Sequence, residues 1–206
     1  MKRTIDEHEA RFDEVAAEYD ELTRPVYRDC VDRVIAGVDP RPADVVLDIG
    51  AGTGVISLAL ADRADRVVGR DISEAMLAQA RQKAAQAGIT NVEFDYGSFL
   101  EPAYDGDATI VTSNYAMHHL DDAGKRAALD IIASYQPRRF VLGDLMFFGD
   151  PDPEYPEYDP DVDDPSTAGW LAAAITAVGF EIVDIHIVSD HVGVIVADEP
   201  REGWNE

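Results

Sequence analysis

"VLDIGAGTG", residues 46–54, places an apolar run directly before three glycines that occupy every second position. A short apolar run bounded by turn residues is typical of a buried strand, and glycines allow a sharp turn after it. The segment "GVISLALADRA", 54–64, then has the apolar content of a helix. The stretch therefore predicts a strand, a glycine turn and a helix in succession.

The same alternation of strands and helices continues along the chain. Helices between successive strands indicate parallel β units with right-handed crossovers, so we expect an α/β fold with helices on both faces of the sheet. The last two strands have a tight connection and are expected to be antiparallel. The expected strands are 44–49, 66–70, 91–95, 108–113, 139–144, 181–190 and 191–198, and the expected helices are 54–64, 73–87, 121–135 and 168–180.

Ligands of such folds bind at the carboxyl ends of the strands, near the point where the strand order reverses. Polar residues and glycines that follow expected strands should therefore meet along one rim of the sheet, although they come from distant parts of the sequence. These residues are Gly50, Asp71, Ser98, Asn114 and Asp144.

Two regions lie outside the alternation. Residues 1–40 show helical apolar spacing interrupted near Pro25, and we expect an N-terminal helical cap there. Residues 41–206 would form the ligand-binding domain, so the chain is expected to be one structural domain overall. Within it, 146–169 is rich in proline, aromatic and acidic residues. A segment of this length inside a compact domain is usually a functional lid or a mobile loop, and we expect a lid-like insertion.

The charge of the chain is unusual. It has 41 acidic and 17 basic residues, for a formal net charge of -24, and only 3 of the basic residues are lysine. Such a chain repels itself at low salt, whereas 1 M salt shortens the screening length to about 3 Å. The composition resembles that of proteins from salt-accumulating haloarchaea, so we expect a halophilic protein. Because nucleic-acid affinity rests largely on Lys and Arg, no nucleic-acid partner is expected.

The sequence also gives expectations about the cellular compartment and about disulfide bonds. There is no apolar run of 18 residues, and "MKRTIDEHEA" at the N-terminus lacks the apolar centre of a signal peptide. We expect a cytoplasmic protein with no membrane partner. The single cysteine, Cys30, excludes an internal disulfide and is expected to be a small buried apolar residue. Oligomeric state leaves no signal in the sequence.

The glycine turn is compatible with more than one ligand. A phosphate-binding P-loop needs a Gly-Lys-Ser/Thr sequence, and no lysine follows here. A dinucleotide-binding turn, G-x-G-x-x-G, needs its third small residue where Val55 stands. An NAD(P)-dependent oxidoreductase stays open as an alternative, although Val55 and the lack of a Tyr-x-x-x-Lys pattern disfavour it. A turn with a purely structural role is a further alternative.

Four stretches together resemble the class I S-adenosylmethionine-dependent methyltransferases, from about Phe12 to Asp198. "VLDIGAGTG" is similar to the family's first motif, (D/E)-x-G-x-G-x-G, and "VVGRDIS" to its second landmark. "TSNYAMHHLDD" resembles the pattern SNxxLHHL, and "RFDEVAAEYDEL" resembles FDxxAxxYD. The resemblance implies a Rossmann-like, seven-stranded, mostly parallel sheet of order 3-2-1-4-5-7-6 with the last strand antiparallel. It also implies S-adenosylmethionine as cofactor.

The resemblance assigns roles to residues at matching positions. Asp48 would organise the glycine loop or accept a hydrogen bond from the ligand's ammonium group, and Asp71 would accept from both ribose hydroxyls. Ile72 and Met76 would contact the adenine, and Tyr19 would line the pocket. The full set of expected cofactor-binding residues is Tyr19, Asp48, Gly50, Gly52, Gly54, Asp71, Ile72, Met76, Ser98, Phe99, Asn114 and Tyr115.

One position departs from the family pattern. The family commonly has Gly-Asp after the third strand, where the aspartate accepts from the adenine amino group, but this chain has Gly97 and Ser98. A neutral hydrogen bond is roughly half as strong as a charge-assisted one. We therefore expect a lower cofactor affinity, or a contribution from Asp95 nearby.

The two histidines of "AMHHL", His118 and His119, are the candidates for catalysis. An imidazole with a pKa near 6.5 suits removal of a proton from an O or N nucleophile. The alternative, a structural role, fits the many methyltransferases that act mainly by positioning the nucleophile. No metal site is expected, because adjacent histidines on a loop should point apart and no HxxxH or HxxE pattern accompanies them.

The function that the resemblance implies is transfer of the sulfonium methyl group to a small-molecule acceptor. A protein that binds S-adenosylmethionine without methyl transfer remains an alternative, because the chemistry demands no single catalytic residue. The acceptor itself, and whether N, O, S or C is methylated, leave no signal in the sequence.

Overall fold

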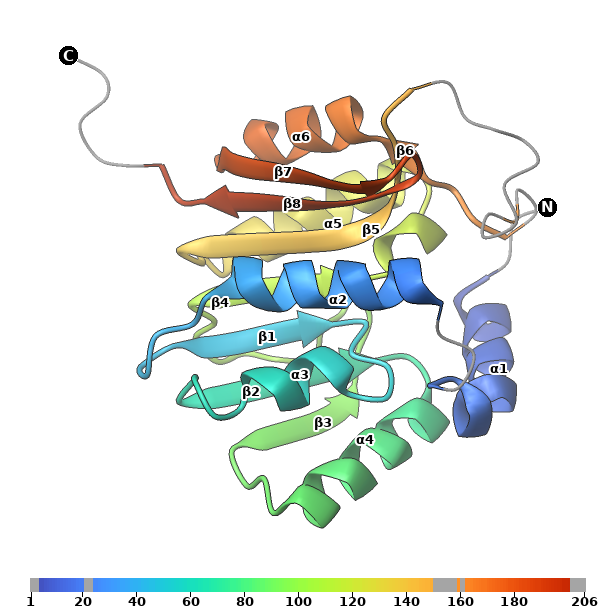
Figure 1. Ribbon diagram of the computed structural model, residues 1–206. Coiled ribbons are helices and arrows are strands. Elements are labelled where there is room, and N and C mark those ends of the chain that lie inside the picture. The colour runs from blue at the N-terminus through green and yellow to red at the C-terminus, as the bar shows by residue number, and fades with distance from the viewer. Residues whose placement is uncertain (1–3, 21–23, 150–158, 160–161, 201–206) are drawn as a thin grey trace.

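The computed structural model describes residues 4–20, 24–149, 159 and 162–200. One sheet runs through it in the order β3-β2-β1-β4-β5-β8-β7, and a short β6 pairs with β5 (Figure 1). The strands are β1 Val45–Ile49, β2 Arg66–Asp71, β3 Val92–Tyr96, β4 Ile110–Asn114, β5 Arg139–Phe147, β6 Ser166–Thr167, β7 Glu181–Ser189 and β8 Val192–Asp198.

The strand order and directions agree with the expectation. β3, β2, β1, β4 and β5 are parallel, β8 is antiparallel to β5, and β7 is antiparallel to β8. The expected end of the fifth strand at residue 144 is wrong, because β5 continues to Phe147. This extension pairs with β6, which has two residues and is too short to show a strand pattern in the sequence.

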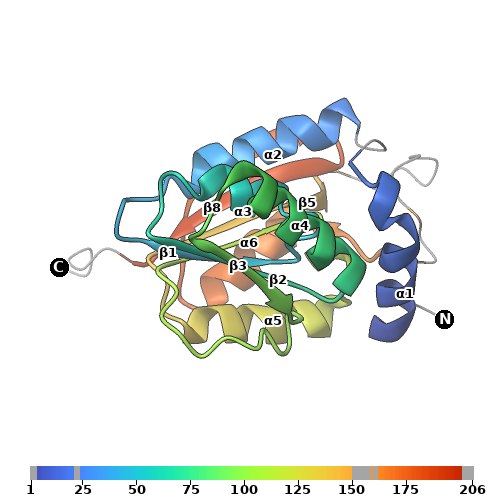
Figure 2. The same cartoon turned by 90° about the horizontal axis from the view of Figure 1, so that it is seen from below.

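Helices cover both faces of the sheet (Figure 2). α2 and α3 pack against one face with Val46, Val67 and Ile110, while α5 and α6 pack against the other. Val46 belongs to the core on the side of α2 and α3, and Leu47 to the core on the side of α5 and α6, because successive side chains of a strand point to opposite faces. The helices are α1 Ile5–Val15, α2 Pro25–Val38, α3 Val55–Leu60, α4 Glu74–Ala87, α5 Asp122–Ser134 and α6 Ala168–Ala177, with 3₁₀ turns η1 Ala16–Glu18 and η2 Met117–His119.

Local signals set some helix ends and distant contacts set others. α4 begins after Ser73, whose hydroxyl accepts from the Met76 N–H, and it ends at Gly88 in the left-handed conformation, as expected. α3 ends at Leu60 rather than at residue 64. The Asn91 side-chain amide donates to the carbonyls of Ala61 and Ala64, at 2.8 and 3.2 Å, and holds this segment in a turn that leads into β2.

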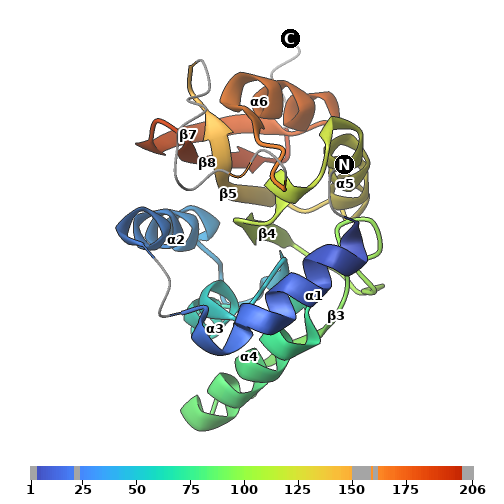
Figure 3. The same cartoon turned by 90° about the vertical axis from the view of Figure 1, so that its right-hand side faces the viewer.

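The N-terminal helices occupy two different places. α1 lies across the carboxyl ends of the parallel strands (Figure 3). α2 instead packs on the sheet through Cys30, Val31, Val34 and Val38, so it belongs to the layer that buries the sheet. Of the lid-like insertion expected at 146–169, residues 150–158 and 160–161 lie outside the described residues. In the described ranges, no helix combines the length and apolar character needed to cross a bilayer.

Candidate active site

A cavity of about 390 Å³ lies at the carboxyl ends of β1, β2 and β4, where α1 crosses the sheet. Parallel strands converge there, and the strand order reverses between β1 and β4, as expected for a ligand site of this fold class. Ten of the residues predicted to bind a cofactor line it: Tyr19, Gly50, Gly52, Asp71, Ile72, Met76, Ser98, Phe99, Asn114 and Tyr115.

Asp71 holds the glycine turn in place from the end of β2. Its Oδ2 accepts from the Gly52 N–H at 2.8 Å, and its Oδ1 accepts from the Ser73 N–H at 2.9 Å. Burial raises the pKa of this carboxyl group, although the backbone N–H groups of Ser73 and Gly52 act in the opposite direction. Asp71 therefore presents a preorganised acceptor to the cavity while fixing the loop beside it.

Asp48 lies behind the turn and does not line the cavity. It is 1% exposed, and its Oδ2 accepts from the Ser57 hydroxyl at 2.6 Å. Burial raises the pKa of Asp48 to about 7, against the effect of Ser57. Of the two roles expected for Asp48, the geometry supports organisation of the loop and the start of α3, and its role toward a ligand ammonium stays a prediction.

Gly54 is also outside the cavity lining, so its expected contact with a cofactor has no support in the geometry. Its φ is +84°, and a Cβ there would lie 2.9 Å from Phe94 Cζ and 3.0 Å from Ala80 Cβ. Gly54 therefore lets α3 start close to β3 and α4. By contrast, a Cβ on Gly52 would meet no atom within 4 Å and would enter the space of the cavity.

The other end of the cavity is formed after β2 and β3. Ile72, Met76, Ser98 and Phe99 line it. The Ser98 N–H donates to the Glu101 carbonyl at 2.9 Å, and the Glu101 N–H donates to the Ser98 hydroxyl at 3.1 Å, which closes a tight turn. Asp95 does not line the cavity, so the alternative that it substitutes for the missing acid has no geometric support.

Asn114 and Tyr115 form the wall that follows β4. The Cys30 thiol donates to Asn114 Oδ1 at 3.2 Å, which orients the amide, and burial raises the pKa of that thiol. Asn114 Nδ2 is buried and makes no hydrogen bond within the described ranges, so it is a donor available to a ligand. The Tyr115 ring packs against the Tyr27 ring, with centroids 5.1 Å apart.

The N-terminal segment is attached to the cavity mouth by polar contacts. Asp13 Oδ1 accepts from the Ser73 hydroxyl at 2.6 Å, and the Gln79 side chain donates to the Ala16 carbonyl at 2.7 Å. The Thr53 hydroxyl donates to Asp20 Oδ1 at 2.6 Å. Tyr19 is held among these contacts, where burial and the nearby Asp71 raise its pKa to about 12.

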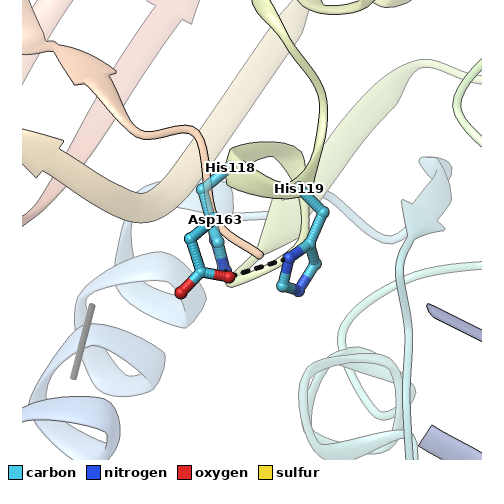
Figure 4. Close-up of side chains that lie close together, drawn as sticks. All are labelled: His118, His119 and Asp163. Atoms are coloured by element: carbon cyan, nitrogen blue, oxygen red, sulfur yellow. Dashed lines mark ion pairs between the residues drawn. The ribbon is translucent and has the colours of Figure 1, made fainter. Parts of the chain in front are cut away.

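His118 and His119 converge on one carboxylate, and the expectation that they point apart is wrong (Figure 4). Their ring centroids are 4.0 Å apart because η2 turns both side chains to the same side. Asp163 Oδ1 lies 3.2 Å from His119 Nδ1 and 3.7 Å from His118 Nε2. Asp163 belongs to the acidic segment whose position the sequence did not indicate.

The two histidines have different surroundings. His118 is 5% exposed, and its Nδ1 contacts Asp144 Oδ1 at 2.5 Å. Asp144, which was expected along the ligand-binding rim, lies within β5 and does not line the cavity. His119 lines the cavity, and burial together with His118 lowers its pKa to about 4. Contact with both histidines holds the Asp163 pKa at about 2, although burial alone would raise it.

Sequence reasoning missed several residues that build this site. His8 and Phe12 of α1 reach the cavity, and the His8 ring lies 4.6 Å from the His119 ring between centroids. Asp13 and Asp20 anchor α1 and η1. The motif FDxxAxxYD included these last two acids, but motif position alone does not indicate that their partners are Ser73 and Thr53.

Comparison with known proteins identifies this arrangement. Residues 46–135, which contain the glycine turn, Asp71, Asn114 and both histidines, match the model of the family described as "Methyltransferase domain". The same segment carries most of the cavity. Residues 46–135 match a methyltransferase domain. Its cavity lies where the sequence motifs of that family predicted a ligand.

The chain is also similar to individual proteins over longer stretches. An uncharacterized methyltransferase of Bacillus subtilis, YrrT, is 32% identical over 146 residues, which cover 68% of this chain and 65% of that protein. The chain spans 60–61% of the length of other curated relatives from Bacillus and Geobacillus, each an uncharacterized methyltransferase.

Solved structures show the same fold at lower identity. DhpI in complex with SAH superposes with a TM-score of 0.74 at 22% identity, over 96% of this chain and 98% of that one. The [4+2]-cyclase SpnF superposes with a TM-score of 0.81 at 15% identity, over 97% of both chains. These two neighbours show that the chain has a Rossmann-like fold.

Proposed function

We propose that the chain transfers the methyl group of S-adenosylmethionine to a small-molecule acceptor. S-adenosylmethionine supplies an electrophilic methyl group on a sulfonium centre and leaves as S-adenosylhomocysteine. The observation that carries the proposal is the carboxylate of Asp71, fixed by two backbone N–H groups at the end of β2 and facing the cavity. A fixed carboxylate in that position is an acceptor for the two ribose hydroxyls of a nucleoside.

The rest of the cavity has groups that suit the other parts of this cofactor. The open space at Gly52 lets the backbone approach the ligand, and Asn114 Nδ2, which has no hydrogen-bond partner among the described residues, can donate to the ligand's carboxylate. Tyr19, Tyr27 and Tyr115 line the same cavity, and aromatic rings attract a cationic sulfonium centre. Ile72 and Met76 provide apolar contact for a purine ring.

The size and cover of the cavity support a small acceptor. Its volume, about 390 Å³, is in the range of small-molecule sites, and α1 lines it through Ile5, His8 and Phe12. An anionic polymer such as RNA is disfavoured by a net charge of -24. His119 lies on the cavity wall beside α1, with its ring centroid 5.5 Å from that of Phe12, and we assign this end to the acceptor.

A second candidate function is binding of S-adenosylmethionine without methyl transfer. It is favoured by one observation, the superposition on a protein named as a [4+2]-cyclase over 97% of the chain. That similarity indicates that the fold can accompany another activity, since function depends on the site and not on the fold. An NAD(P)-dependent oxidoreductase has less support, because Val55 opens α3 where the dinucleotide turn has its third small residue.

The proposal is tested by turnover with methyl-labelled S-adenosylmethionine in molar KCl, over a panel of small O, N and S nucleophiles and total RNA. We expect label in a small molecule together with an equal amount of S-adenosylhomocysteine. Label in RNA alone would contradict the small acceptor. Binding of S-adenosylhomocysteine without transfer to any member of a broad panel would favour the second candidate.

A further inference from the structure

We propose that His118, His119 and Asp163 form a binding site for one divalent transition-metal ion of the Zn²⁺ class at the acceptor end of the cavity. The three side chains come from η2 and from the segment that precedes β6, and Figure 4 shows them facing one another. Their ligand atoms, one from each residue, lie within 4.8 Å of one another. Imidazole and carboxylate are donors that Zn²⁺, Co²⁺ and Fe²⁺ accept.

The distances suit a shared ion. Ligands at about 2.0–2.1 Å in a tetrahedral arrangement are about 3.3 Å from one another. Asp163 Oδ1 is 3.2 Å from His119 Nδ1 and 3.7 Å from His118 Nε2. The third separation, between the two histidine ligand atoms, is within 4.8 Å, so rotation of the histidine side chains would complete the coordination.

The orientation of the groups distinguishes this cluster from an ordinary ion pair. At 3.2 Å, His119 Nδ1 and Asp163 Oδ1 are in ion-pair contact but are poorly aligned for a hydrogen bond, and neither atom has another hydrogen-bond partner in the described ranges. Both atoms are buried. Donor atoms that lie close together but do not point at each other are what a common third atom requires, because each ligand directs its lone pair at the ion.

Asp144 prepares His118 for coordination. Its Oδ1 contacts His118 Nδ1 at 2.5 Å, and its carboxylate also accepts from the backbone N–H groups of His118 and Leu145, at 3.0 and 2.8 Å. These contacts fix the ring and favour the tautomer with the proton on Nδ1, which leaves a lone pair on Nε2. A carboxylate behind a ligating histidine is the usual support of such sites.

Asp163 is also held in position by its neighbours. Its Oδ2 accepts from the Asp159 N–H at 3.0 Å, which leaves Oδ1 directed at the histidines. The Asp164 N–H donates to the His118 carbonyl at 2.7 Å and ties the two segments together. The carboxylate therefore has one oxygen occupied by the backbone and one available for an ion.

Three protein ligands leave at least one coordination position, as in catalytic zinc sites. Of the three, His119 is on the cavity wall. If the chain is the methyltransferase proposed above, an oxygen of the acceptor would bind there and its O–H would become more acidic beside the cation. Metal binding itself does not depend on that function.

The test is zinc binding by the untagged full chain, stripped with a chelator and titrated with Zn²⁺ alone. We expect one ion retained per chain after dialysis, and Co²⁺ should give the visible absorption of a low-coordinate site. Asp163→Asn and His119→Gln should each weaken binding more than about 100-fold, and Asp144→Asn about 10–100-fold. Circular dichroism and S-adenosylhomocysteine binding show separately whether each variant is folded and whether the cofactor site is intact.

The matched control is His186→Gln. His186 Nε2 lies 3.0 Å from Asp184 Oδ2 in a half-exposed pair on β7, so it reports adventitious binding to a surface histidine and carboxylate. This variant should bind zinc like the wild type. The absence of stoichiometric zinc binding would overturn the proposal, as would wild-type affinity in folded Asp163→Asn and His119→Gln.

Discussion

At the scale of single residues, two acids on neighbouring strands have different structural roles in one site. Asp48 of β1 and Asp71 of β2 lie two residues out of register in the sheet, since Asp48 pairs with Gly69 and Ile49 with Arg70. Asp71 accepts from backbone N–H groups and faces the cavity, whereas Asp48 accepts from Ser57 inside the protein. The sequence places both acids beside the glycine turn, but only the packing around them separates the two roles.

Burial of Asp48 predicts a specific pH dependence of stability. Its pKa in the folded protein is about 7, above the ordinary value of 3.8, so folding favours the protonated form. This contribution is fully present below about pH 4 and is lost as the pH rises to about 7. Asp48→Asn does not titrate, so its free energy of unfolding relative to wild type should rise over that window by a few kcal/mol, at most about 4, and then level off.

Urea unfolding in molar KCl from pH 4 to pH 8 measures this difference, in which the other titrating groups cancel. Asp95→Asn, at an exposed position of β3, controls for removal of one negative charge. A difference between Asp48→Asn and wild type that stays flat with pH would show that burial does not control this carboxyl group.

Much of the cavity could be predicted from motifs, because the glycine turn, Asp71 and Asn114 follow strands that any parallel sheet brings to one edge. The convergence on Asp163 could not. It depends on a contact between residues 118 and 163, within an acidic segment where no periodic pattern indicates position. The sequence also did not predict that His118 and His119 point to the same side, because the short η2 turn that brings them together left no signal in the sequence.

At the scale of elements, helix ends that are set by local residues could be predicted from the sequence, whereas those set by distant contacts could not. The start and end of α4 were predicted because Ser73 and Gly88 act on their own helix. The end of α3 was not, because Asn91 fixes it from 30 residues away. Attachment of α1 to α4 through Asp13 and Ser73 is likewise a contact across 60 residues, which no local pattern records.

The close packing at the start of α3 gives a prediction with an internal control. Gly54 and Gly88 both have positive φ, of +84° and +69°, but a Cβ would crowd Phe94 and Ala80 only at Gly54. Gly88→Ala should lower the free energy of unfolding by about 1–2 kcal/mol, the conformational cost alone. Gly54→Ala should cost a further 1–3 kcal/mol or so for overpacking. Equal losses in denaturant unfolding would contradict the packing role of Gly54.

At the scale of the whole molecule, charge is the dominant property. With a net charge of -24, repulsion between acids opposes the compact state wherever salt does not screen it. Ion pairs relieve part of this at a few places, such as Arg139 with Asp198, at 2.6 Å. The composition predicts this repulsion, and the acids that would cause it are spread along the whole chain.

We therefore expect the melting temperature to rise as KCl increases from about 0.1 to 2 M, the range in which the screening length falls to a few Å. A variant with Asp32→Asn, Asp130→Asn and Glu181→Gln, three exposed acids on α2, α5 and β7, should show a shallower rise and a higher melting temperature at low salt. Thermal unfolding followed by circular dichroism measures both. An equal salt response in the variant would assign the effect to the ion rather than to charge repulsion.

The central claim is that the cavity at the ends of β1, β2 and β4 binds S-adenosylmethionine through Asp71. Titration calorimetry of S-adenosylhomocysteine and of NADH in molar KCl tests it most directly. We predict one S-adenosylhomocysteine site per chain, no measurable NADH binding, and a loss of about 10–100-fold in affinity in Asp71→Asn but not in Asp95→Asn. Binding of NADH without S-adenosylhomocysteine, or unchanged affinity in Asp71→Asn, would contradict it.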